Sequence, residues 1–238
     1  MSLRSIELNK EQEAATVAPL GNIRVIAGPG SGKTRVLVSR ILHLINNENV
    51  KPSEILAVTF TKRAALELYS RVISNKNIQD TTAIKMLTTS TLHSFCSKLL
   101  RTYSKYDNLR HDYSIYDEND CKKIVKNVLN ELNMDLSVFS APVIIDQISL
   151  YKRSGDLSSV FRTSNDHSIA FLEIFKLYQA HLRANNAKDF DDLVLDTLRM
   201  LQDESSVARQ HIKKKYRHLL IDEFQDIGIH SSLSHLVT

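Results

Sequence analysis

The chain has 238 residues, of which 42% are hydrophobic and 24% are charged. These values are ordinary for globular proteins and exclude collagen-like, low-complexity and coiled-coil chains. No apolar run reaches the ~18 residues of a membrane span, and Glu7, Glu11 and Glu13 stand where a secretory signal would be apolar. Two cysteines cannot build a disulfide framework or a four-thiolate metal site. We therefore expect a cytoplasmic or nuclear protein without membrane contact.

The net charge of +4 permits binding to nucleic acid without demonstrating it. Its distribution along the chain is more informative. Residues 1–97 contain 12 Lys/Arg and 7 Asp/Glu (+5), residues 98–187 contain 12 and 11 (+1), and residues 188–238 contain 7 and 9 (−2). This gradient predicts contacts with polyanions in the first part of the chain and cation chemistry in the last.

Strand and helix patterns alternate over the first hundred residues. Asn9, followed three residues later by Gln12, has the capping-box spacing that begins a short helix. Alternating strands and helices predict a parallel sheet covered on both faces. The predicted elements are a buried strand at 22–27, a loop at 28–32, a helix at 33–46, a strand at 55–60 after Pro52, a helix at 62–73 and a strand within 83–92.

Only helical patterns occur between about residues 98 and 187. Asp117 or Asn119 can cap a first helix, Pro142 begins a second, and residues 169–183 form a third. Helices at 189–201 and 205–215 and a strand at 217–221 then resume the earlier pattern. We therefore predict an α/β domain made of residues 1–97 and 188–238, interrupted by an all-helical subdomain at 98–187.

The strongest chemical signal is the glycine-rich loop between the strand at 22–27 and the next helix. Such a loop turns successive N–H groups inward, and the helix dipole behind it favours an anion. Lys33 would reach the β- and γ-phosphates of a nucleotide, and the Thr34 hydroxyl would coordinate Mg²⁺. A plain turn is the alternative. The predicted phosphate-binding residues are Ala27, Gly28, Pro29, Gly30, Ser31, Gly32, Lys33 and Thr34, with Ala27 where the strict pattern has glycine.

A second signal is the apolar run 219–221, which ends in Asp222 and Glu223. Adjacent carboxylates can have different roles. Asp222 can hold Mg²⁺, while Glu223 takes the proton from an attacking water. An acidic pair after a strand often has no function of this kind. Combined with Lys33 and Thr34 in the same chain, it predicts a magnesium–nucleotide site.

The segments AGPGSGKTRVL and IDEFQD resemble superfamily 1 DNA helicases of the UvrD/Rep type. The resemblance runs from about Leu8 to Asp226 and corresponds only to the N-terminal part of such an enzyme. It implies a RecA-like P-loop NTPase fold whose helical insert matches the subdomain of that family. It also implies ATP and Mg²⁺ as cofactors, single-stranded and duplex DNA as substrates, DNA unwinding driven by ATP hydrolysis, and repair or replication proteins as partners.

The resemblance assigns further nucleotide contacts. Leu8–Gln12 is similar to the family's Q motif, in which Gln12 would recognise adenine, although an ordinary helix cap is the competing interpretation. Arg35 would flank the base. Gln225 would sense the γ-phosphate and couple it to DNA movement, completing a catalytic set with Lys33 and Glu223.

The resemblance also assigns DNA contacts. Phe60 would stack on a base and Thr61 would contact phosphate, while Lys62 replaces the usual Asn and keeps a donor. From the residues alone, Phe60 could equally be core at a strand end, and His93 could be structural. The segment 91–95 is similar to the family's Thr-Phe-His-Ser motif, which makes His93 a backbone contact.

Asp189–Leu193 resembles the segment that re-enters the main domain, although by charge alone it is a solvated helix start.

The last residues depart from the family pattern, because Ile227-Gly228-Ile229-His230 replaces the usual Thr-Asn and downstream Gln. We therefore expect an incomplete sheet that lacks its central strand, and feeble ATP hydrolysis by this chain. A non-hydrolysing fragment that binds nucleotide or DNA is the first alternative. A small-molecule kinase is the second, since phosphate loops are widely shared.

Overall fold

The computed structural model describes residues 7–75, 82–104, 112–135, 139–161 and 166–224. The chain divides into two compact units, one of Met1–Phe95 with Arg209–Thr238 and the other of Cys96–Ala208. The domain boundaries expected from the sequence, at 97/98 and 187/188, stay a prediction. Gln225 and the departures after Asp226 lie outside the described residues.

A three-stranded parallel sheet forms the centre of the first unit. β1 (Ile55–Thr59) lies between β2 (Thr88–Thr91) and β5 (His218–Ile221), and every residue of β1 is buried. Because all three strands run in the same direction, their carboxyl ends share one edge of the sheet and their amino ends share the opposite edge. We call these the carboxyl edge and the amino edge.

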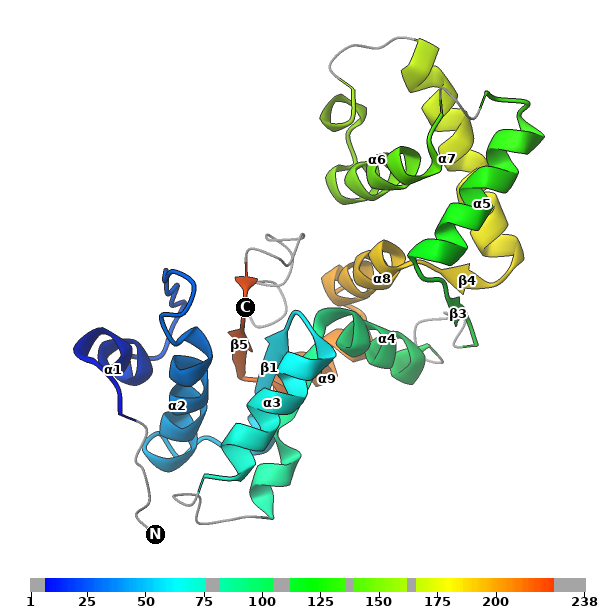
Figure 1. The fold of residues 1–238 in the computed structure, drawn as a ribbon. Coiled ribbons are helices and arrows are strands. Elements are labelled where there is room, and N and C mark those ends of the chain that lie inside the picture. Colours follow the sequence, from blue (N-terminus) through cyan, green and yellow to red (C-terminus); the bar gives the residue numbers. More distant parts are fainter. Residues whose placement is uncertain (1–6, 76–81, 105–111, 136–138, 162–165, 225–238) are drawn as a thin grey trace. The chain divides into compact units, whose positions relative to one another are not determined.

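Helices of the first unit pack on this sheet much as their apolar spacing predicts. α2 (Lys33–Asn46) and α3 (Lys62–Ile73) have the predicted bounds and share a core with β1 (Figure 1). α1 (Lys10–Val17) begins with the predicted capping box, in which Asn9 and Gln12 exchange hydrogen bonds. The 3₁₀ turns η1 (Pro52–Glu54) and η2 (Ala83–Met86) precede β1 and β2. α4 (Leu92–Tyr103) and α9 (Val207–Lys215) complete the helices that reach this unit.

The predicted buried strand at 22–27 is wrong. The segment pairs with no strand among the described residues, and the side chain of Ile26 is 85% exposed. A strand needs a neighbour for its backbone groups, and in the described sheet β5 pairs only with β1. The expectation of a sheet without its central strand rests on the residues after Asp226, which lie outside the described part of the chain, and it stays a prediction.

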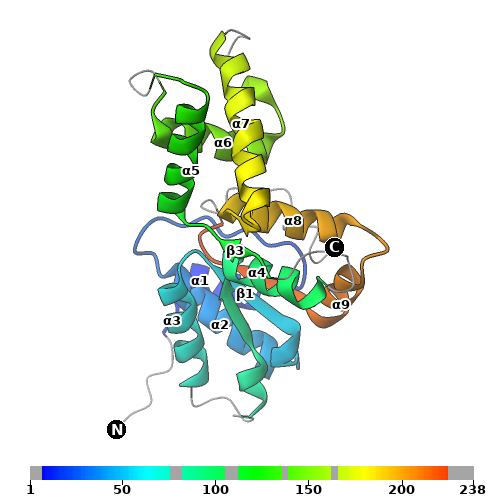
Figure 2. The same cartoon turned by 90° about the vertical axis from the view of Figure 1, so that its right-hand side faces the viewer.

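The second unit contains a helical core that the sequence anticipated. α5 (Glu118–Glu131), α6 (Ala141–Ser154) and α7 (Asp166–Ala184) share a buried cluster, and the 3₁₀ turn η3 (Leu157–Ser159) packs against α6 (Figure 2). Asp117, and not Asn119, caps α5. The subdomain is not all-helical, because β3 (Ser114–Ile115) pairs in parallel with β4 (Ala187–Lys188).

A buried ionic cluster ties α6 to the start of α8 (Phe190–Gln202) within this unit. Lys152 Nζ lies 2.6 Å from both Asp189 Oδ2 and Asp192 Oδ1, and the hydroxyl of Tyr178 donates to Asp189 at 2.8 Å. Asp189 caps α8 as its charge predicts, but it is buried. The interpretation of this segment as a solvated helix start is therefore wrong.

Candidate functional site

The glycine-rich loop makes a tight turn directly before α2. Gly30 and Gly32 have φ angles of 73° and 86°, a left-handed conformation that favours glycine. Ser31 closes the turn, because its N–H and its hydroxyl both donate to the Gly28 carbonyl, at 3.3 and 2.7 Å. The first helical hydrogen bond runs from Val36 N–H to Gly32 O. The N–H groups of residues 33–35 thus have no partner within the helix, as an anion-binding helix start requires.

Gln12 links α1 to this loop. Its Nε2 donates to the Ser31 carbonyl at 2.8 Å, and its Oε1 accepts from Asn9 N–H at 3.0 Å. A Cβ atom on Gly32 would lie 2.9 Å from Gln12 Nε2, so only glycine fits at this position without a shift. Both amide atoms of Gln12 are thus bonded within the chain. The predicted contact with adenine, which would require Gln12 to exchange these bonds, stays a prediction.

The two acidic residues follow directly from β5 at the carboxyl edge. Asp222 N–H donates to the Val58 carbonyl at 2.8 Å, which extends the pairing with β1 by one residue. Glu223 then adopts a φ of 50°, and its N–H donates to Asp222 Oδ1 at 3.1 Å. This turn of the backbone points the Glu223 side chain back toward the phosphate loop.

Lys33 and Glu223 meet in this structure, with Nζ 3.5 Å from Oε1 and both side chains partly exposed. The sequence predicted that the loop and the acidic pair converge, and for these two residues the geometry agrees. Burial raises the pKa of the Asp222 carboxyl, and the neighbouring Glu223 carboxylate raises it further, while Lys33 opposes both effects.

The donor set is suitable for Mg²⁺ bound together with a nucleotide. No cluster of three or more His, Cys, Asp or Glu side chains that could hold a metal occurs among the described residues. Mg²⁺ commonly uses one or two carboxylates and takes its remaining oxygens from phosphates and water. Asp222 and the partly buried Thr34 fit this mode.

The predicted DNA-contact residues lie at the same carboxyl edge, immediately after β1 and β2. Phe60 is 56% exposed, so its interpretation as core is wrong. Thr61 caps α3 by accepting from Ala64 N–H at 3.0 Å, and Lys62 is exposed in the first turn of that helix. His93 is half-buried in the first turn of α4. Their roles on DNA stay predictions.

Arg35 and Thr91 make structural hydrogen bonds that the sequence analysis did not predict. The Arg35 guanidinium donates to the Glu7 carbonyl at 3.3 Å, which holds the start of the chain near the loop. The Thr91 hydroxyl accepts from Ser94 N–H at 3.2 Å and so caps the start of α4. A threonine before an apolar helical pattern is a cap signal that could have revealed α4.

Comparisons with known proteins agree with this geometry. Residues 8–230 match the UvrD/REP helicase N-terminal domain. The chain is 37% identical over 226 residues to a Mycoplasma capricolum subsp. capricolum protein named probable DNA helicase II homolog. It is 34% identical to the ATP-dependent DNA helicase UvrD1 of Mycobacterium bovis and 33% identical to the ATP-dependent DNA helicase PcrA of Staphylococcus aureus.

Each alignment covers 92% of this chain but only 28–30% of the relative. The described part of the chain contains no helix long and apolar enough to cross a membrane. The match over most of the chain, the parallel sheet and the phosphate loop lead to one assignment. The chain belongs to the UvrD/REP helicase family, as its N-terminal domain with a P-loop fold.

Proposed function

We propose that this chain binds Mg²⁺-ATP and single-stranded DNA as the N-terminal part of an ATP-dependent DNA helicase. The observation that carries the proposal is the 3.5 Å approach of Lys33 Nζ to Glu223 Oε1. It joins the phosphate loop before α2 to the acidic pair after β5, two segments far apart in the sequence. Family membership supports this interpretation over the small-molecule kinase alternative.

In this proposal the phosphate loop and the start of α2 bind the triphosphate. The N–H groups of residues 33–35 would donate to phosphate oxygens, and Lys33 would neutralise the β- and γ-phosphates. Thr34 and Asp222 would hold Mg²⁺, which would supply positive charge to offset the charge that develops on the phosphate oxygens. Gln12 and Arg35 would contact the base, after Gln12 releases Ser31 or Asn9.

Glu223 is the proposed general base. In this structure its carboxylate pairs with Lys33. When phosphate takes over the Lys33 ammonium, the Glu223 carboxylate would orient an attacking water and accept its proton. Gln225, two residues further along, is proposed to sense the γ-phosphate and pass its state to the DNA-contact residues.

DNA binding is proposed at the same carboxyl edge. The exposed ring of Phe60 offers a stacking surface for a base, for which alanine substitution costs ~1–3 kcal/mol. Lys62 and the first turn of α3 would contact phosphate together with Thr61, and His93 would contact the backbone from α4. Because these residues and the acidic pair all follow parallel strands, movement of one group can be transmitted to the other through β1.

A second candidate function is a fragment that binds nucleotide and DNA without hydrolysing ATP. It is favoured by the open edge of β5 in the described sheet. In related nucleotidases an arginine supplied from outside the phosphate loop contributes ~10³–10⁵ in rate. The chain need not contain every group that hydrolysis requires.

Two measurements on the 238-residue chain separate these candidates: ATP hydrolysis with and without single-stranded DNA, and binding of a fluorescent ATP analogue. We expect binding by the wild-type chain and by Glu223→Gln, with any DNA-stimulated hydrolysis lost in Glu223→Gln. Nucleotide binding without hydrolysis supports the fragment. Absence of nucleotide binding by the folded wild-type chain contradicts both.

A further inference from the structure

The segment that leads into β5 is strongly basic. Residues 209–218 read RQHIKKKYRH and contain no Asp or Glu. Lys214, Lys215 and Arg217 are exposed, and Lys213 is partly exposed. Among the described ion pairs none involves these four side chains, although the Lys215 ammonium lies 4.9 Å from the ring centre of Tyr216.

The basic segment is held rigidly on the first unit. Ile212 and Tyr216 are buried, and the Tyr216 ring packs edge-on against Phe95 with centroids 5.8 Å apart. The Tyr216 hydroxyl shares a hydrogen bond of 3.1 Å with Thr88 Oγ1, at the start of β2. Arg217 N–H donates to the Glu54 carbonyl at 2.9 Å, at the start of β1. The exposed cations are therefore presented from a fixed backbone.

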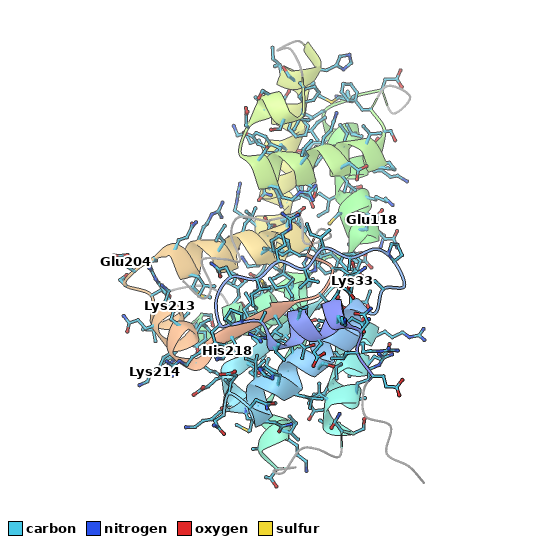
Figure 3. The ribbon with its side chains drawn as sticks, turned by 90° about the vertical axis from the view of Figure 1, so that its left-hand side faces the viewer. Lys33, Glu118, Glu204, Lys213, Lys214 and His218 are labelled. Atoms are coloured by element: carbon cyan, nitrogen blue, oxygen red, sulfur yellow. The ribbon has the colours of Figure 1, made fainter. Side chains whose placement is uncertain are left out.

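The other two strands bring further cations to the same amino edge. Exposed Lys51 precedes η1 and β1, and exposed Lys85 lies in η2 before β2. Because the three strands are parallel, the segments that precede them all lie at one edge of the sheet. Figure 3 shows Lys213, Lys214 and His218 around the start of β5, with Lys33 near its other end.

Helix electrostatics explain only part of this pattern. Lysines in the last turn of α9 are favoured by the helix dipole. That effect does not account for Arg217, Lys51 or Lys85, which lie outside α9. Burial lowers the pKa of His218, Glu54 opposes this effect, and Arg217 and Arg40 add to it.

We infer that the amino edge of the sheet is a second nucleic-acid surface, which binds a phosphodiester backbone independently of sequence. Its residues are Lys51, Lys85, Lys213, Lys214, Lys215 and Arg217. Lysine is depleted in the cores of protein interfaces, whereas clustered Lys and Arg without stacking aromatics suit phosphate oxygens. This surface shares no residue with the proposed sites at the carboxyl edge, so DNA could contact both edges at once.

The test uses the 238-residue chain and its salt-dependent binding to a duplex and to a single-stranded DNA oligonucleotide. The variant is Lys214→Gln/Arg217→Gln. The matched control is Lys126→Gln/Arg183→Gln, which removes the same charge from exposed positions of the other unit. Phe60→Ala reports separately on the carboxyl edge, and circular dichroism checks that every variant is folded.

For the duplex, each lost phosphate contact lowers the magnitude of the slope of log K against log salt by ~0.9. We therefore expect the double variant to lose about 2 units of slope and to bind about tenfold or more weakly at about 50 mM salt. The control should retain the wild-type slope, and Phe60→Ala should weaken only single-strand binding. Equal slopes for the double variant and the wild type, equal losses in the control, or competition by polyglutamate stronger than by duplex would each overturn the inference.

Discussion

Lys33 in the first unit and Lys152 in the second both pair with carboxylates, and these pairs differ in burial. The Lys152 side chain is 3% exposed and contacts two carboxylates at 2.6 Å, whereas Lys33 is 28% exposed and contacts one at 3.5 Å. A buried ammonium whose partners are fixed by helix packing has no room to exchange them. A half-exposed ammonium at a helix start can give up its partner when a stronger anion arrives. The contacts of Lys152 therefore stabilise the fold, whereas the Lys33–Glu223 pair has the properties expected of a binding site.

The largest expected effect is the loss of stability when Lys152 is removed. Lys152→Met should lower the free energy of unfolding by about 3–5 kcal/mol, because Asp189 and Asp192 would remain buried without a counter-charge. Lys33→Met should cost less than about 1 kcal/mol, as for other partly exposed pairs. Urea unfolding measures both. Equal losses would show that the two lysines do not differ in this way.

We expect the backbone conformation of the phosphate loop to position Lys33, whereas helix packing positions Lys152. Gly32→Ala should therefore destabilise the chain by about 1–2 kcal/mol, because residue 32 has a left-handed backbone and the new Cβ would meet Gln12. It should also weaken nucleotide binding. Gly28→Ala is the matched control for the stability measurement alone, since nothing lies within 4 Å of a Cβ there. If Gly32→Ala changes neither the free energy of unfolding nor the affinity for nucleotide, the loop does not depend on this contact.

The smallest expected effect concerns pH. The pKa of Asp222 lies above its ordinary value of 3.8 because of burial and Glu223. The folded state then binds the proton more tightly than the unfolded state, so this contribution to stability is present below pH ~4 and is lost as pH rises through the folded pKa. At neutral pH, Asp222→Asn should stabilise the chain by less than about 1 kcal/mol, because solvent screens the partly exposed carboxylate.

The stability difference between Asp222→Asn and the wild type should shrink as the pH falls toward 4. Urea unfolding at several pH values measures it. A variant that is less stable than the wild type at neutral pH would mean that Asp222 has a structural role in place of the proposed metal-binding one.

Local patterns predicted most of the described helices, but not α4. α2 and α3 have their predicted bounds because apolar spacing and caps are local properties. Local patterns could not show whether the segment 22–27 forms a strand. Its apolar composition resembles that of β1, but a strand forms only where another strand supplies hydrogen bonds, and such a neighbour is a property of the whole fold.

In the candidate site, too, the sequence predicted some features and missed others. Residue types and spacing predicted that Lys33 and the acidic pair would meet, because the phosphate loop and the end of β5 each have a recognisable sequence. Three other features depend on contacts between distant segments. They are the two hydrogen bonds of the Gln12 amide, the burial of Asp189 beside Lys152, and the cluster of cations at the amino edge. No local pattern of charge or hydrophobicity contains that information.

The central claim is that Lys33, Thr34 and Asp222 converge on one magnesium nucleotide. The most direct test measures the affinity for ATP with and without Mg²⁺ in the wild-type chain and in Asp222→Asn, whose Lys33 is intact. We predict that Mg²⁺ tightens ATP binding in the wild type and has little effect in Asp222→Asn. Equal tightening by Mg²⁺ in both proteins would contradict the claim.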